Sequence, residues 1–313
     1  MKVIVSAAQF APEVTNLEIA VSKAVDIIVQ AAKENSQLVV FPETWLLGYP
    51  YWASMGTRDP LFHAWMGVLR QQSGPINDHR LQPIAKAAAK HKIAVMIGMH
   101  EKDGGSLYNT QLLYSPDGSL ANAHRKLIPT NTEKLVWGQG DGSDLAAVDM
   151  GFGKVGGLIC FEHQMTLARY AMCSLGEQIH CGQWPGHAHV TPMIDASMRQ
   201  LAHENGCFVV SAREVMSVDR LPKGAPDAGD DSDRWYGVGG SAIIAPNATN
   251  IATAPEDEEV LLTAEIDLSM IDMIKYHIDN VGHYSRPDVF QLFWDDNPKP
   301  PVLRASEVEA NDD

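Results

Sequence analysis

Short apolar runs alternate along this chain with amphipathic helical patterns, and this alternation limits the possible folds more than any other feature. Residues 2–8 and 37–41 are predicted strands, and Asn16 can cap a helix that runs to about Glu34 between them. Further strands are predicted at 93–99, 107–114, 120–126, near 178, and at 207–211, 239–244 and 260–266. Further helices are predicted at 61–72 and 78–91, after Cys160 through Leu175, from Pro192 with Thr191 as its cap, and at 269–277. The pattern predicts an α/β fold.

Hairpins interrupt the alternation. Pro-Asp-Gly joins the runs 107–114 and 120–126, and a second pair surrounds 150–153. The sheets should therefore be mixed rather than purely parallel. With no internal repeat or linker, we expect one domain over 1–298 and a short acidic tail over 299–313. The segment 220–235, rich in Pro, Gly and Asp, is predicted to be an exposed loop.

The charge of the chain limits its partners. A net charge of −15 argues against nucleic acid and against an anionic membrane surface, because both would be repelled. The first residues, MKVIVSAAQFAPE, lack the apolar length of a signal peptide or membrane span, so we expect a cytoplasmic protein. We expect the four cysteines, Cys160, Cys173, Cys181 and Cys207, to stay reduced there.

Three predicted strands end in three chemically different groups. Glu43 follows LVVF and a proline, Lys126 closes the strand at 120–126, and Cys160 closes VGGLIC. A thiol acts as a nucleophile only with a base to take its proton and a cation to hold the developing charge. Alone, a buried Cys is usually a small hydrophobe, and an isolated Glu or Lys usually faces solvent. Together they suggest a Cys-Glu-Lys hydrolase.

The segments FPETW, HRKLIPT and GLICFEH, in this order, resemble the three signature segments of the nitrilase superfamily of carbon-nitrogen hydrolases. TEKLVWGQGDGS, GEQIHCGQWPG and VGHYSRPDVF resemble segments of its nitrilase branch, so the resemblance covers nearly the whole chain. Glu162 and His163 after the Cys also favour the nitrile-hydrolysing branch. Nitrilases usually carry Trp where this chain has Phe161, which leaves pocket width and substrate preference open.

The resemblance implies a four-layer α-β-β-α sandwich of two mixed sheets. It also implies that Cys160 is the nucleophile, Glu43 the general base and Lys126 the cation, with Glu133 as a second carboxylate. The implied reaction converts an organic nitrile, through a thioimidate and an acyl-enzyme on Cys160, to a carboxylic acid and ammonia. No step of it needs a metal ion or an organic cofactor.

Several aromatic residues lie beside these motifs and are candidates for binding substrate: Tyr49, Trp137, Phe161 and Trp184. Aromatics at strand ends are at least as often core. His283 is an even choice between a functional and a structural role. We also expect Lys126 to lower the pKa of Cys160 relative to the other thiols, although Glu43 and Glu133 act the other way.

Alternatives remain open. An amidase or a cyanide-hydrolysing enzyme would use the same chemistry, and a non-catalytic assembly or binding protein could share the fold. The family resemblance implies a homodimer at least, or a larger spiral homo-oligomer. The cluster His180, Cys181, His187 and His189 contains metal-ligand types, but no CxxC or HExxH pattern frames it, so a structural role is favoured.

Overall fold

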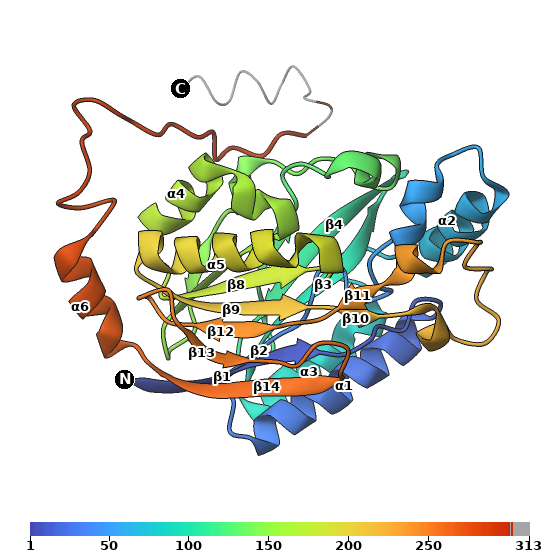
Figure 1. Ribbon diagram of the computed structural model, residues 1–313, viewed down its shortest axis with the longest axis horizontal. Coiled ribbons are helices and arrows are strands. Elements are labelled where there is room, and N and C mark those ends of the chain that lie inside the picture. Colours follow the sequence, from blue (N-terminus) through green and yellow to red (C-terminus); the bar gives the residue numbers. More distant parts are fainter. Residues whose placement is uncertain (301, 303–313) are drawn as a thin grey trace.

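Two six-stranded sheets form the centre of the molecule in the computed structural model, which describes residues 1–300 and 302 (Figure 1). The first sheet has the order β14-β1-β2-β3-β4-β5 and contains β1 (Lys2–Gln9), β2 (Leu38–Val40), β3 (Ala94–Asp103), β4 (Ser106–Tyr114), β5 (Leu120–Arg125) and β14 (Val260–Asp267). The second has the order β13-β12-β9-β8-β7-β6 and contains β6 (Ala147–Asp149), β7 (Lys154–Ile159), β8 (Ile179–Trp184), β9 (Phe208–Arg213), β12 (Ala242–Ile244) and β13 (Asn250–Thr253). A small ribbon pairs β10 (Val215–Met216) with β11 (Gly237–Val238).

Both sheets are mixed, as predicted. The strands β1, β2 and β3 are parallel, as are β7, β8 and β9. The hairpins β3-β4-β5 and β6-β7 add antiparallel strands. Because β14 pairs antiparallel with β1 along its whole length, the two ends of the fold lie side by side in one sheet.

Helices cover the outer faces, which gives the expected four layers. The helices α1 (Leu17–Lys33) and α3 (Gln82–His91) lie against the first sheet, and α4 (Thr166–Ser174) and α5 (Thr191–Asn205) lie against the second (Figure 1). Apolar side chains of both sheets meet between them, including Val5 of β1 and Val210 of β9. Two further helices, α2 (Pro60–Gln72) and α6 (Ser269–His277), lie outside these layers. Within the described residues, no helix combines the length and apolarity needed to span a bilayer.

Most predicted helix limits are close to those in the structure, and two predictions are corrected. Asn16 caps α1, since its side chain accepts a hydrogen bond from the Ile19 amide at 3.1 Å. Thr191 does not cap α5: Val190 already has helical backbone angles, so Thr191 lies inside the helix, where its hydroxyl has no partner among the described residues. The helix predicted directly after Cys160 is a 3-10 turn, Cys160–Gln164, followed by α4.

The segment 220–235 is less exposed than predicted. Trp235 at its end is 1% exposed, and its ring lies 4.8 Å from that of Trp65 on α2. The Trp65 indole also donates a hydrogen bond to the Asp227 carbonyl at 2.9 Å. The prediction considered composition alone, and this loop has an aromatic anchor at its end. The predicted acidic tail lies almost wholly outside the described residues.

Candidate active site

Cys160 stands at the point where β7 turns into the 3-10 turn Cys160–Gln164. Its φ is +51°, a left-handed conformation that a residue with a side chain rarely adopts. The thiol is 2% exposed and lines a cavity of about 770 Å³. The turn thus places a strained, buried thiol on the wall of this cavity.

Glu43 approaches the Cys160 sulfur from the loop after β2. This loop crosses Gly98 of β3 so closely that a Cβ there would lie 2.3 Å from the Thr44 amide nitrogen, which only glycine permits. The Glu43 carboxylate is fully buried, and its Oε1 accepts hydrogen bonds from Asn109 Nδ2 at 2.7 Å and Lys126 Nζ at 2.8 Å. Its Oε2 has no hydrogen-bond partner among the described residues. This free oxygen is available to a proton on a neighbouring group.

Lys126 lies directly after β5 and joins two carboxylates. Besides its bond to Glu43, its ammonium donates to Glu133 Oε2 at 2.7 Å. Glu133, in the 3-10 turn Asn131–Leu135, also accepts from the Thr130 amide at 2.7 Å and the Tyr49 hydroxyl at 2.8 Å. All three charged groups are buried, so each depends on the others for compensation.

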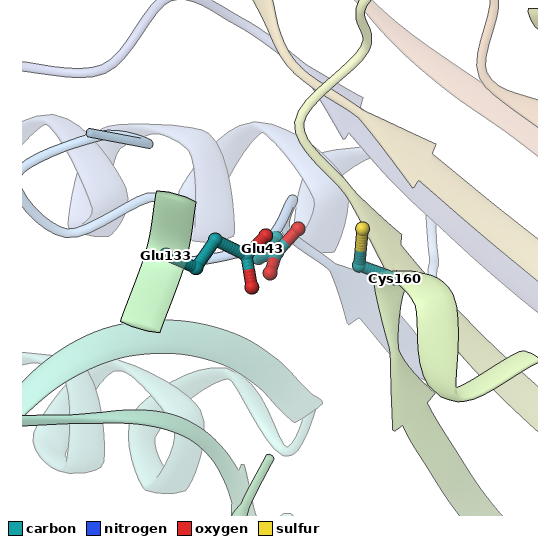
Figure 2. Close-up of side chains that lie close together, drawn as sticks. All are labelled: Glu43, Glu133 and Cys160. Atoms are coloured by element: carbon teal, nitrogen blue, oxygen red, sulfur yellow. The ribbon is translucent and has the colours of Figure 1, made fainter. Parts of the chain in front are cut away.

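Figure 2 shows the Glu43 and Glu133 carboxylates gathered opposite the Cys160 sulfur. One oxygen of each carboxylate and the sulfur all lie within 4.8 Å of one another. Such a group could ligate a metal ion by distance alone. The Lys126 ammonium already forms ion pairs with both carboxylates, however, and its charge would repel a second cation there.

The pKa values of this cluster are set mainly by burial. Burial raises the pKa of Glu43 to about 7, with the Lys126 charge opposing the rise and the Glu133 charge adding to it. Burial and then the Glu43 charge raise the pKa of Cys160 as well, and Lys126 only partly offsets them. Burial alone would lower the pKa of Lys126, but the negative charges of Cys160, Glu43 and Glu133 raise it overall.

The Lys126 charge lowers the pKa of Cys160, as expected, while Glu43 and Glu133 act the other way. Burial outweighs the effect of Lys126, so the pKa of this thiol is held well above its ordinary value. The resting thiol therefore keeps its proton at neutral pH, and Glu43 is poised to accept that proton when attack begins. Thiol and carboxyl titrate as a pair rather than as independent groups. A pKa of Cys160 below those of the other thiols stays a prediction.

Glu162 ties together the chain segments that carry the nucleophile and the cation. Its Oε2 accepts from the Ile159 amide at 2.6 Å, next to Cys160, and its Oε1 accepts from the Leu127 amide at 2.7 Å, next to Lys126. His124 also donates to this carboxylate at 3.0 Å and has a raised pKa of about 10, because the charges and hydrogen bonds of Glu162 and Asp144 outweigh its burial. The sequence identified Glu162 only as a branch marker; its position two residues after Cys160 was the available signal.

A second series of buried, hydrogen-bonded side chains supports the same turn. His163 Nδ1 donates to the Cys160 carbonyl at 2.6 Å, and its Nε2 lies 2.9 Å from His180 Nε2. His180 Nδ1 lies 2.9 Å from Glu177. Burial lowers the pKa of His163, which keeps its ring neutral. His180 thus belongs to this hydrogen-bonded series, whereas His187 and His189 line the cavity. The histidine cluster seen in the sequence is therefore divided between two places.

The substrate-binding candidates have different positions. Tyr49, Phe161 and Trp184 line the cavity. Trp137 lies one layer behind, with its ring 6.0 Å from that of Tyr49. His283 is exposed beyond α6 and is not on the cavity wall, so the structure does not bring it to the site within one chain. Tyr51 and His187 on the wall, and Asp231, Arg234 and Tyr236 from the loop before β11, were not selected from the sequence.

Comparisons with known proteins agree with this geometry. Residues 4–276 match the family model for carbon-nitrogen hydrolases. An aliphatic nitrilase of Rhodococcus rhodochrous is 36% identical, covering 96% of this chain and 81% of that protein. Nitrilase 2 of Arabidopsis thaliana is 37% identical over 93% of this chain and 88% of its own length. The crystal structure of a carbon-nitrogen hydrolase from Helicobacter pylori G27 has the same fold, with a TM-score of 0.72 and 21% identity over 92% of this chain and 97% of that one.

Proposed function

Because this chain belongs to the carbon-nitrogen hydrolase family and, within it, to the nitrilases, we propose that it hydrolyses an organic nitrile to a carboxylic acid and ammonia with Cys160 as its nucleophile. The observation that carries this proposal is the Glu43 carboxylate, which has an oxygen within 4.8 Å of the Cys160 sulfur, an unpartnered Oε2, and an Oε1 bonded to the Lys126 ammonium. This arrangement supports Glu43 as the base, Cys160 as the nucleophile and Lys126 as the cation.

In the proposed first step, Glu43 accepts the Cys160 proton as the sulfur attacks the nitrile carbon. A pKa near 7 suits a group that must take up and later release a proton at neutral pH. Negative charge develops on the nitrile nitrogen, where the Lys126 ammonium and the Phe161 amide, at the start of the 3-10 turn, can stabilise it. Protonation of that nitrogen gives a thioimidate on Cys160.

In the later steps, water attacks this thioimidate carbon and ammonia leaves, which gives a thioester. A second water molecule releases the carboxylic acid and regenerates the thiol. Glu43 and Glu133 are the carboxylates that can accept protons from these waters, and the Tyr49 hydroxyl holds Glu133 from the cavity side. The Lys126 ammonium keeps its charge throughout, in line with its raised pKa.

Two alternatives use the same residues. Cyanide is far smaller than the cavity, whose volume of about 770 Å³ and aromatic wall favour an organic nitrile. An amidase, or an enzyme that stops partly at the amide, differs only in substrate and in how the tetrahedral intermediate collapses. A non-catalytic scaffold has no need of three buried ionisable groups in hydrogen-bond contact.

The test is ammonia release from aliphatic, aromatic and arylaliphatic nitriles beside their amides. Cys160→Ala should abolish turnover, whereas Cys173→Ala, which removes a buried thiol of α4 outside the cavity, should retain it. Cleavage of amides without any nitrile would instead support the amidase. Full turnover by Cys160→Ala would refute the proposed nucleophile.

We further propose that residues 1–298 act as one domain in a cytoplasmic homo-oligomer, a dimer or a larger spiral. The family match over 4–276 and the pairing of β1 with β14 support a single unit. Large apolar side chains near α4 and after α6 are exposed, including Leu167 at 66% and Phe290 at 80%, and their burial between subunits would be favourable. Sedimentation velocity should give a species larger than 34.2 kDa.

A further inference from the structure

His187, between β8 and α5, forms part of the cavity wall and is held there by packing. Its ring meets Tyr51 edge-on with centroids 4.9 Å apart, and Tyr49 edge-on at 5.4 Å. Its backbone pairs with Gly237 in an isolated antiparallel bridge. Within the described part of the chain, no hydrogen bond fixes either ring nitrogen, and burial and the neighbouring His189 are what act on its pKa.

Three neighbouring polar side chains of the aromatic wall, Tyr49, Tyr51 and Trp184, already have partners. The Tyr49 hydroxyl donates to Glu133 at 2.8 Å, and the Tyr51 hydroxyl donates to the Pro185 carbonyl at 2.6 Å. The Trp184 indole is directed at the Met198 sulfur, 3.4 Å away. Among these four ring side chains of the described wall, His187 is therefore the one whose hydrogen-bonding atoms are free.

The charge state of His187 narrows what it can bind. Burial, with a smaller contribution from His189, lowers its pKa to about 4, so the ring is neutral at pH 7. A neutral imidazole offers one donor and one acceptor. A hydroxyl group can accept a hydrogen bond from the ring N–H or donate one to the other ring nitrogen, so it pairs with either tautomer. A carboxylate can only accept, so it would pair with the ring N–H alone.

Resting on the proposed function, we propose that His187 is a specificity-determining residue that hydrogen-bonds a hydroxyl group of the substrate, so that hydroxylated nitriles are preferred to their methyl analogues. Tyr49 links this position to the reaction centre, since its hydroxyl contacts Glu133 while its ring contacts His187. The Tyr49 ring therefore separates His187 from Glu133, and the substrate hydroxyl that binds His187 should be only a few bonds from the nitrile carbon.

The experiment compares kcat/KM for pairs that differ only by hydroxyl against methyl. 3-Hydroxybutyronitrile is paired with 3-methylbutyronitrile, and 4-hydroxypentanenitrile with 4-methylpentanenitrile. The wild type should favour the hydroxyl member of at least one pair by about tenfold or more, since a site that hydrogen-bonds a substrate hydroxyl discriminates against the analogue without it. His187→Leu should bring this ratio close to one, and His187→Gln, which keeps a donor and an acceptor, should retain part of it.

His203→Leu is the matched control, because His203 is an exposed histidine of α5 that is not on the cavity wall. It should leave the hydroxyl-to-methyl ratio as in the wild type. A wild-type ratio near or below one in both pairs, or an unchanged ratio in His187→Leu, would overturn the inference. If no nitrile is hydrolysed but amides are, the proposed function fails separately, and the same ratios measured on the matched amides still decide the role of His187.

Discussion

At the scale of single residues, Glu162 sets the distance between the nucleophile and the cation. Each of its oxygens accepts a backbone amide, one next to Cys160 and one next to Lys126. In Glu162→Gln, the side-chain NH₂ group would face one of those backbone N–H groups, and two donors cannot form a hydrogen bond. The loss of the second bond would let the two segments separate, and a shift of about 1 Å between reacting groups can cost about 10²-fold in rate.

We therefore expect Glu162→Gln to lower kcat by about 10²-fold with a smaller change in KM. Rates should be expressed per folded chain, measured by the near-UV circular dichroism of the native state, so that unfolded protein does not count. The control is Glu177→Gln, which alters the His163 and His180 chain behind the same turn but not the Leu127 contact. A purely structural role for Glu162 would lower the melting temperature and leave kcat per folded chain unchanged.

A second residue-scale prediction concerns Glu214, which is fully buried. Neither of its carboxyl oxygens has a hydrogen-bond partner among the described residues, and the nearby Tyr51 hydroxyl donates to Pro185 instead. Burial raises the pKa of Glu214 well above its ordinary value, and the Glu43 charge adds to the rise. The folded protein therefore holds this proton more tightly than the unfolded chain does.

The sign of the pH effect follows. The stability contributed by the protonated Glu214 is fully present below the unfolded pKa of about 4.5 and is lost as pH rises toward the folded pKa. Glu214→Gln, which mimics the protonated form, should match the wild type in melting temperature near pH 4.5 and exceed it increasingly up to pH 8. Melting curves at both pH values check this, and a constant difference between the two proteins would contradict it.

At the scale of elements, the crossing of the Glu43 loop over β3 is the tightest constraint on the site. Gly98→Ala would place a Cβ 2.3 Å from the Thr44 amide nitrogen, which is backbone and cannot rotate away. We expect a loss of about 1–3 kcal/mol in the free energy of unfolding, together with a lower kcat because Glu43 moves with the loop. Gly67→Ala on α2, where a Cβ meets nothing within 4 Å, is the matched control and should be neutral or stabilising.

Elements with a strong periodic pattern were predictable from the sequence. The helix α1, its Asn16 cap and the mixed character of the sheets follow from local apolar spacing and turn residues. The short strands β10, β11 and β13 escaped prediction, because strands of two to four residues have too little pattern of their own. The start of α5 was misplaced because the conformation of Val190, rather than the residue type of Thr191, decides where the helix begins.

The site was predictable to the extent that its residues end strands. Glu43, Lys126 and Cys160 follow β2, β5 and β7, and Glu133 was added by resemblance. What the sequence could not supply is the balance of charges, because the pKa of Cys160 depends on how completely the cluster is buried. His187 and Tyr51 were missed because a cavity wall is made by packing between distant segments.

At the scale of the whole molecule, the two sheets hold the reacting groups from opposite sides. Glu43 and Lys126 follow strands of the first sheet, whereas Cys160 follows a strand of the second. Apolar side chains of both sheets, Val5 and Val210 among them, pack in one cluster between the sheets. This packing therefore also fixes the catalytic geometry. We expect nitrile turnover to be lost in the same transition as the packing of the two sheets.

The most direct measurement is to quench the enzyme during turnover of a nitrile and locate the covalent intermediate by peptide mass spectrometry. The account predicts a thioimidate or acyl adduct on Cys160, with Cys173, Cys181 and Cys207 unmodified. An adduct on another residue, or steady turnover in which repeated quenching at different times yields no adduct on Cys160, would contradict it.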